Sequence, residues 1–311
     1  MSAPAGGPIA VLGPGGVGGF LAAALARAGD DVVVVAREET AALIAAEGIA
    51  VRSLRLGDFT AHPRAASRLE EPVAALLVAT KAGGLPAALE RVDGQPGLAV
   101  PLLNGLEHME TVRARFGAAV AAGTIRIEAD RPAPGRVEQT SPFLRVDLAS
   151  ADPALRPHLE ALEARLEAAE VPARVSDSEA DVLWGKLVRL NALACTTSAV
   201  DRPLGFIRDD PDWRAALHAC ISEAAAVARA EGAEIPPERV VAELDDAHAT
   251  LGSSMQRDIA SGRAPELDEI PGAVLRAGAR HGLRCPTIAR LCVVIAERAG
   301  TAPPAGIAVS D

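Results

Sequence analysis

Roughly the first half of the chain alternates between short apolar runs and longer segments whose apolar residues recur at helical spacing. The apolar runs predict buried strands over residues 8–12, 31–37, 50–56, 73–80, 98–103, 123–128 and 137–148. The longer segments predict helices over 17–28, 106–116 and 153–170. Because strands and helices alternate, this half predicts a parallel sheet with helices on both faces.

The pattern becomes helical throughout after residue 176. Helices are predicted over 179–200, 210–231, 236–250, 266–281 and 286–299. Glycines between these segments mark helix ends. The sequence therefore predicts an α/β domain over 1–176, followed by an all-α domain over 177–311.

A glycine-rich turn, Gly13-Pro14-Gly15-Gly16-Val17-Gly18, lies between the first predicted strand and the first predicted helix. Glycines at this spacing allow a tight turn and a close approach of the backbone to a pyrophosphate at the helix N-terminus. We therefore expect a Rossmann-like dinucleotide-binding domain in which Gly13, Gly15, Gly16, Val17 and Gly18 contact the cofactor. The alternative is a glycine-rich turn in another α/β fold.

The end of the second predicted strand bears on which dinucleotide binds. NAD-binding domains usually carry an acidic residue there, which accepts a hydrogen bond from the ribose 2′-hydroxyl. This chain has Arg37, whose guanidinium suits a 2′-phosphate, so we expect NADPH/NADP+. Glu38 and Glu39 follow directly and leave NADH as the alternative.

Composition and charge exclude several classes of function. The 311 residues contain 31 Lys and Arg against 41 Asp and Glu, a formal net charge of −10, which argues against nucleic-acid or anionic-membrane partners. The chain has no Tyr, so enzymes that use Tyr as the general acid are excluded. It has two lysines, Lys81 and Lys186, and a lysine can give up a proton where arginine cannot.

The cysteines and the apolar runs bear on compartment and partners. Four Cys occur without a C-x-x-C pair, so we expect no metal site and a reducing compartment, the cytoplasm. No run predicts a membrane span, and the segment 9–28 does not have the basic start of a signal peptide. The apolar helical domain is compatible with a homodimer.

Short polar motifs follow in a characteristic order along the chain. They are Thr80-Lys81, Asn104-Gly105, Leu183-Trp184-Gly185-Lys186-Leu187, Ser253-Ser254-Met255 and Glu266-Leu267-Asp268. With the glycine turn, this order resembles the ketopantoate reductase (2-dehydropantoate 2-reductase) family over roughly residues 8–300. The resemblance implies NADPH-dependent reduction of a 2-oxo acid, ketopantoate, to pantoate.

The resemblance also implies residue roles. Lys186 would be the general acid that protonates the alkoxide as hydride reaches the ketone carbon, with Glu266 binding substrate and placing the lysine. Asn104 and Lys81 would lie near the nicotinamide ribose and the substrate, and Ser254 would contact the substrate. Arg37 would recognise the 2′-phosphate, in agreement with the reasoning from the second strand.

This chain departs from the family pattern on the substrate side. Where the biosynthetic enzymes often carry Asn, four and eight residues after the lysine, it has Leu190 and Ala194, and Leu251 is apolar as well. Pro265 replaces the usual Thr before Glu266. Asn191 is the amide left on this helix, and we include it among the substrate-binding candidates. The alternatives are a reductase of another ketone or 2-oxo acid, and a catalytically silent nucleotide-binding or redox-sensing protein.

Overall fold

The structure, a computed structural model, describes residues 6–304 and divides into two compact units. One unit holds the described residues up to Leu103, together with His108–Val182. The other holds Asn104–Glu107 and the described residues from Leu183 onward. The four-residue segment 104–107 thus belongs to the helical unit, although its neighbours on both sides belong to the α/β unit. The predicted boundary at residue 176 stays a prediction.

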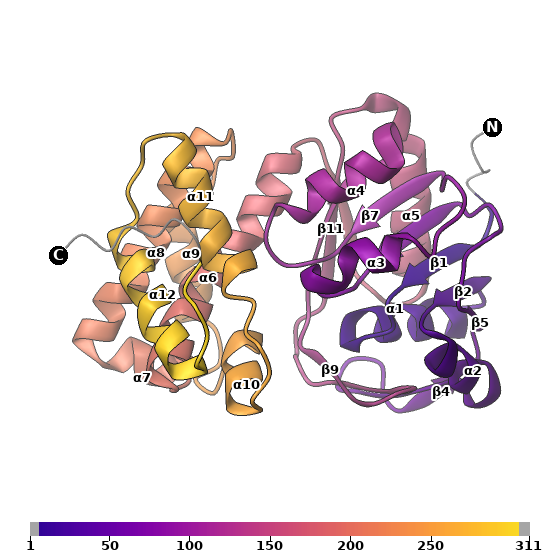
Figure 1. Ribbon diagram of the computed structural model, residues 1–311, viewed down its shortest axis with the longest axis horizontal. Helices are drawn as coiled ribbons and strands as arrows, with labels where there is room; N and C mark the ends of the chain where they lie inside the picture. Colours follow the sequence, from indigo (N-terminus) through magenta and orange to yellow (C-terminus); the bar gives the residue numbers. More distant parts are fainter. Residues whose placement is uncertain (1–5, 305–311) are drawn as a thin grey trace. The chain divides into compact units, whose positions relative to one another are not determined.

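A five-stranded parallel sheet forms the centre of the α/β unit (Figure 1). Its strands, in spatial order, are β5 (Arg64–Ala66), β2 (Val32–Val35), β1 (Ile9–Leu12), β6 (Ala75–Val78) and β7 (Leu98–Pro101). Every residue of β1, β2, β6 and β7 is buried, which explains why these strands read as unbroken apolar runs. The prediction of an α/β domain followed by a helical domain is confirmed.

Helix α1 (Gly16–Arg27) lies between two sheets (Figure 1). It contacts β1 and β2 on one side and a four-stranded sheet on the other. The strands of that second sheet are β4 (Phe59–Ala61), β3 (Ile49–Ser53), β10 (Arg136–Gln139) and β9 (Ala129–Ala133). Residues 18–25 of α1 are all buried, so the helix has no solvent face, and its apolar sequence follows from that position.

A third sheet, of three strands, completes the α/β unit. It contains β12 (Ala173–Ser176), β11 (Arg145–Ala149) and β8 (Ala122–Arg126), and α5 (Arg156–Ala168) packs against β12. The single strand predicted over 137–148 was wrong, because β10 and β11 belong to different sheets. Between them the Ser141 hydroxyl donates to the Phe143 carbonyl at 2.7 Å and so turns the chain.

The remaining short elements of the α/β unit are α2 (Glu38–Glu47), the 3-10 turn η1 (Ala82–Gly84), α3 (Leu85–Leu89), α4 (His108–Phe116), η2 (Gly117–Ala119) and η3 (Pro153–Leu155).

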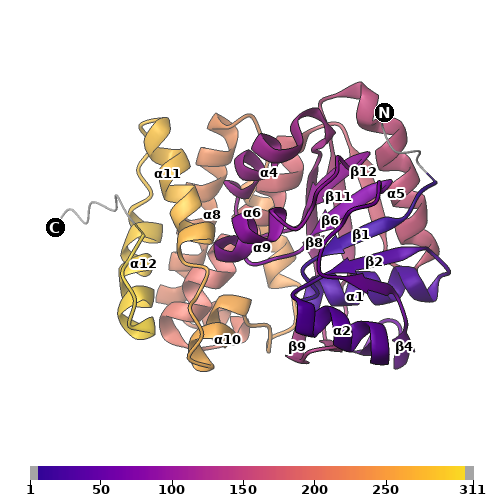
Figure 2. The same cartoon turned by 45° about the vertical axis from the view of Figure 1, so that its right-hand side comes forward.

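The second unit is built from helices (Figure 2). They are α6 (Glu179–Val200), which starts in the first unit, α7 (Leu204–Asp209), α8 (Pro211–Ala230), α9 (Pro237–Asp245), α10 (Ser254–Ala260), the π-helix η4 (Asp268–Gly272), α11 (Ala273–Arg280) and α12 (Pro286–Ala299). Helix α8 packs against α7, α9, α11 and α12. No helix in the described part of the chain has the length and apolar character needed to span a membrane.

Candidate functional site

Most glycines of the glycine-rich turn are required by the fold itself. Gly13 has a φ of +91°, which disfavours a side chain. A Cβ on Gly18 would lie 2.2 Å from the Gly13 carbonyl oxygen, and one on Gly16 would lie 2.3 Å from the carbonyl oxygen of Ala129 in β9. Both distances are too short for any real contact. The geometry of the turn and the packing of α1 against β9 therefore explain these three glycines without a ligand.

Gly15 is the exception. Its φ is −75°, and the nearest atom to a Cβ built on it is the Ala79 carbonyl oxygen, 4.0 Å away. The fold would accept a side chain at this position, so the missing side chain leaves room for something outside the chain. Gly15 is the N-cap of α1, which has no side-chain cap and no acidic residue in its first turn. Backbone N–H groups at such an end attract a phosphate.

A hydroxyl next to this turn also lacks a partner. Thr80 Oγ1 is buried and has no hydrogen bond within the described residues, and the Thr80 methyl group lies directly beside Gly13. Buried hydroxyls are normally paired, because an unpaired one loses its hydrogen bonds to water. The turn and its surroundings thus fit a dinucleotide, which would use both the open space at Gly15 and the first-turn N–H groups of α1.

Arg37 lies between the end of β2 and the start of α2. It is exposed, it is the N-cap of α2, and it makes no ion pair within the described residues that would hold its guanidinium elsewhere. Glu38 and Glu39 occupy the first turn of α2, where the helix dipole favours carboxylates and supplies a structural reason for them. Lys81 is exposed at the N-cap of η1, three positions after Val78, the last residue of β6.

Two residues expected at the site are joined directly in the helical unit. Asn104 Nδ2 donates to Glu266 Oε2 at 2.7 Å, and both side chains are partly buried. Gly105 makes this approach possible: its φ is +82°, and a Cβ there would lie 2.2 Å from the Glu269 carbonyl oxygen. The Asn104-Gly105 turn is therefore packed against the backbone that follows Glu266.

Glu266 lies two residues before an irregular helix, η4. The Glu266 carbonyl accepts from Ile270 N at 3.1 Å, and the Leu267 carbonyl accepts from Gly272 N at 3.1 Å, five residues on. Pro271 has no N–H to donate, so the usual i to i−4 pattern cannot continue, and the chain forms η4 before α11 begins. The helix predicted over 266–281 is thus a π-helix followed by an α-helix.

Lys186 and Asn191 lie on the same helix but on different sides. α6 is a regular α-helix from Glu179 to Val200, so five residues correspond to about 140° of rotation. Lys186 is partly exposed, whereas Asn191 is fully buried, with its Oδ1 accepting from Cys195 Sγ at 3.6 Å. Asn191 Nδ2 has no partner among the described residues. Its role in substrate binding stays a prediction.

Ser254 begins α10 and is positioned by buried hydroxyls that we did not anticipate from the sequence. Ser253, 2% exposed, is the N-cap and accepts from Gln256 N at 3.1 Å. Thr197 Oγ1 lies 3.0 Å from Ser253 Oγ, and Ser198 Oγ lies 3.3 Å from it. These hydroxyls fix the start of α10 against α6. The available signal was the run of three hydroxyl residues, 196–198, inside the otherwise apolar stretch 192–200 of this helix.

Charge around Glu266 is dominated by carboxylates. Burial raises the pKa of Glu269 above its ordinary value, and the neighbouring charges of Glu266 and Asp268 raise it further. Arg276 is the cation of this segment: its hydrogen bonds to Glu107, and then to Asp268, raise its pKa further above that of an ordinary arginine. Within the described residues, no group of three His, Cys, Asp or Glu side chains is placed to hold a metal.

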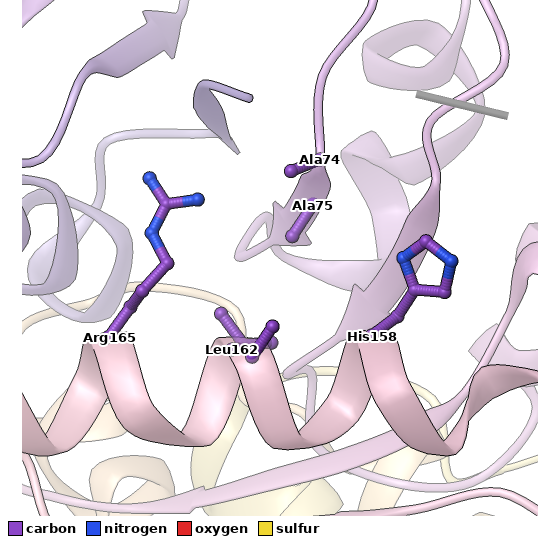
Figure 3. Close-up of a pocket in the computed structure, with 6 residues that line it drawn as sticks. Ala74, Ala75, His158, Leu162 and Arg165 are labelled. Carbon is purple, nitrogen blue, oxygen red and sulfur yellow. The ribbon is translucent and has the colours of Figure 1, made fainter. Parts of the chain in front are cut away.

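A small hollow in the α/β unit lies apart from these residues (Figure 3). Leu162, His158 and Arg165 on α5 point toward Ala74 and Ala75 at the start of β6. Ligands of parallel sheets bind at the opposite, carboxyl end of the strands, where Gly13 and Thr80 lie. Arg165 is already paired with Asp30 at 2.8 Å and with the Gly7 carbonyl at 2.8 Å. His158 Nδ1, by contrast, is buried without a hydrogen-bond partner among the described residues, so the hollow keeps one free polar atom.

Comparison with known proteins assigns the chain to a family. Residues 9–152 match the family model "Ketopantoate reductase PanE/ApbA", and residues 180–299 match the model of its C-terminal domain. The chain is 31% identical to the 2-dehydropantoate 2-reductase of Caulobacter vibrioides, over 92% of this chain and 97% of that protein. It is 30% identical to the 2-dehydropantoate 2-reductase of Mycobacterium tuberculosis, over 89% of this chain and 93% of that protein.

Solved structures agree with this assignment. A 2-dehydropantoate 2-reductase from Geobacter metallireducens superposes with a TM-score of 0.85 at 27% identity, over 93% of this chain and 99% of that chain. D-mandelate dehydrogenase, solved with NADH and anilino(oxo)acetate, shares the fold with a TM-score of 0.85 at 20% identity, over 94% of this chain and 98% of that chain. The chain is therefore an oxidoreductase that belongs to the ketopantoate reductase (PanE/ApbA) family.

Proposed function

We propose that the chain reduces 2-dehydropantoate (ketopantoate) to pantoate with NADPH. The observation that carries the proposal is the 2.7 Å hydrogen bond between Asn104 and Glu266, which unites two residues expected at the site from 162 positions apart. The family membership and the relatives named 2-dehydropantoate 2-reductase support it. The reaction would place the chain in pantothenate biosynthesis, in the cytoplasm.

The cofactor would be held by the α/β unit. The N–H groups at the start of α1 and the open space at Gly15 would bind the pyrophosphate, and Arg37 would pair with the 2′-phosphate. Lys81 would contribute near the nicotinamide ribose. Bound NADPH would supply the hydride that reduces the ketone carbon.

The helical unit would supply the acid and the substrate contacts. As the carbonyl oxygen gains negative charge, the Lys186 ammonium would stabilise it and donate the proton that completes the hydroxyl group. Glu266 would accept from the substrate hydroxyl, with Asn104 fixing the orientation of its carboxylate. Ser254, at the start of α10, would donate to the substrate. Asn191 is the remaining candidate for a contact with the substrate.

The test is steady-state kinetics with NADPH on a panel of 2-oxo acids. We expect ketopantoate to be reduced, Lys186→Ala to lower kcat by about 10²–10⁴ as for loss of a positioned acid, and the Kd for NADPH to stay within about threefold. Lys186→Arg should fail as well, because arginine keeps the charge but does not release the proton. Near-normal turnover in Lys186→Ala would overturn the role of this lysine.

A second candidate is a reductase of the same family that acts on a more apolar 2-oxo acid. Leu190 and Ala194 favour it, because they stand four and eight residues after Lys186 on a regular helix and so share its side. The same panel decides between the two: a higher kcat/KM for 2-oxo acids with plain alkyl or aryl side chains would favour the second candidate. Absence of turnover with every member would instead favour a silent nucleotide-binding protein.

A further inference from the structure

A second set of contacts holds the segment Asn104–Glu107 in place, next to the bond between Asn104 and Glu266. The guanidinium of Arg276, on α11, donates two hydrogen bonds to the Glu107 carboxylate, from Nε to Oε1 at 2.7 Å and from an Nη to Oε2 at 2.7 Å. This parallel, two-point geometry is the strongest that an arginine makes with a carboxylate, and it fixes orientation as well as distance.

The same guanidinium also binds the first residue of η4. It donates to Asp268 Oδ1 at 2.7 Å, to the Asp268 backbone carbonyl at 2.9 Å and to Oδ2 at 3.3 Å. Gly272 lies next to this contact: a Cβ there would come within 3.1 Å of Arg276 and 3.2 Å of the Asp268 carboxylate. The missing side chain at residue 272 therefore lets Arg276 extend back to Asp268.

Arg276 thus ties together the two chain segments that carry Asn104 and Glu266. Glu107 is three residues after Asn104, and Asp268 is two residues after Glu266. The 104–107 segment and η4 also touch directly where Gly105 meets the Glu269 carbonyl. With Arg276 removed, Glu107 and Asp268 would face each other without a cation, beside Glu266 and Glu269.

We propose that Arg276, through Glu107 and Asp268, is a positioning residue that keeps Asn104 aligned with the Glu266 carboxylate. This inference rests on the proposed function, in which Glu266 binds the substrate. A carboxylate displaced by about 1 Å can cost up to about 10²-fold in rate without any change in the chemical groups present. Arg276 would therefore affect turnover although it need not touch substrate or cofactor.

The activity experiment compares Arg276→Ala with Arg280→Ala. Arg280 lies one turn further along α11 and pairs with Glu231 at 3.1 Å, so its loss removes a similar half-exposed ion pair elsewhere. We expect Arg276→Ala to lower kcat by about 10-fold to 100-fold, with the Kd for NADPH unchanged, and Arg280→Ala to behave as wild type. Arg276→Lys should recover little, because an ammonium cannot form the two-point contact.

A double variant separates positioning from general loss of structure. In an Asn104→Ala background the alignment is already lost, so adding Arg276→Ala should lower kcat by less than about threefold further, since residues that act as one unit are not additive. Full multiplication of the two effects, or a kcat for Arg276→Ala within about threefold of wild type, would overturn the inference.

Amide hydrogen exchange gives a readout that does not depend on activity. Arg276→Ala should speed exchange in residues 105–108 and 268–272 by about tenfold or more, with no change in α12, and Arg280→Ala should leave these segments unchanged. Unchanged exchange in Arg276→Ala would overturn the inference. If the wild type reduces no 2-oxo acid, the proposed function fails, and exchange alone decides whether Arg276 holds this segment.

Discussion

The side-chain amide of Asn104 is hydrogen-bonded to the carboxylate of Glu266 at 2.7 Å. Both residues belong to the helical unit, in which Asn104 is part of the separate four-residue segment 104–107. One oxygen of the carboxylate is thereby occupied, and the other keeps its capacity to accept. A hydrogen bond from an amide donor fixes the plane of the carboxylate. Glu266 is thus prepared to receive one further donor in a defined direction.

We expect the two residues to be coupled in catalysis. Asn104→Ala and Glu266→Gln should each raise KM and lower kcat, and the double variant should be less impaired than the product of the two single effects. The coupling should amount to about 0.5–3 kcal/mol in transition-state stabilisation, the range for residues in direct contact. Kinetics of the four proteins measures it. Strict additivity would mean that the bond has no part in the reaction.

Glu266→Gln also separates catalysis from helix stability. If Glu266, two residues before η4, acted only through the dipole of that helix, its kinetics would hold, and the free energy of unfolding would fall by a few tenths to about 1 kcal/mol. Melting curves recorded on the same samples therefore serve as the control for this prediction.

Gly15 and Gly16 should respond in opposite ways to the same substitution. Gly16→Ala places a methyl group against the Ala129 carbonyl, so we expect a loss of about 1–3 kcal/mol in the free energy of unfolding. Gly15→Ala meets no atom closer than 4.0 Å and should fold with less than about 1 kcal/mol lost. Its Kd for NADPH should rise about tenfold or more, because the methyl group fills the space expected for the pyrophosphate.

Chemical denaturation and NADPH titration of both glycine variants check this pair. Tight cofactor binding by Gly15→Ala would contradict the position assigned to the pyrophosphate. An undiminished stability of Gly16→Ala would instead contradict the close packing of α1 against β9.

Arg37 should decide the choice between the two nicotinamide dinucleotides. Arg37→Ala should weaken NADPH binding by about 1.5–3 kcal/mol, the value of a hydrogen bond to a charged group, and leave NADH binding within about twofold. Arg52→Ala is a suitable control, since Arg52 is a largely exposed arginine of the same unit, with a side chain 75% exposed. A wild-type preference for NADH would make Glu38 the more credible ribose partner.

The apolar positions near Lys186 predict limited substrate discrimination. Ketopantoate carries a hydroxyl that 2-oxoisovalerate lacks, and a site rejects the analogue strongly only when it has polar groups left unpaired. With Leu190, Ala194 and Leu251 in place of amides, we expect kcat/KM to favour ketopantoate by about 10-fold to 200-fold. A preference above about 10⁴ would reveal a fuller polar set, with Asn191 as the first residue to examine.

Local signals were enough for the long helices and the buried strands. α6 and α12 have the predicted bounds, and the end of α12 is marked by Gly300, which adopts a left-handed conformation. β1, β2, β6 and β7 are fully buried, so an unbroken apolar run identified each of them. The edge strand β5 is exposed or half-buried and has no such run, and it was not predicted. In contrast, α2 buries only Ala41 and Ile44, too little apolar periodicity to be recognised as a helix.

Features that depend on distant partners were not readable from the sequence. The region 137–148 is apolar enough for one strand, but its two halves pair with strands in different sheets. At the candidate site, the family resemblance identified Asn104 and Glu266 individually but not their contact. Arg276 and Glu107 lie 169 positions apart, and neither belongs to a recognisable sequence motif, so only the fold reveals that they form an ion pair.

The enclosed position of α1 has a consequence for the order of folding. The turn that would bind the cofactor is encoded within the first twenty residues, yet α1 is covered only when β9 and β10, ending at Gln139, have been made. Until then, a ribosome-bound nascent chain would expose one apolar side of this helix, and contacts of such long sequence separation form slowly. We therefore expect the nascent protein to become competent for the dinucleotide only after residues 129–139 have emerged, so that cofactor capture reports on completion of the whole α/β unit and not of its first βαβ segment.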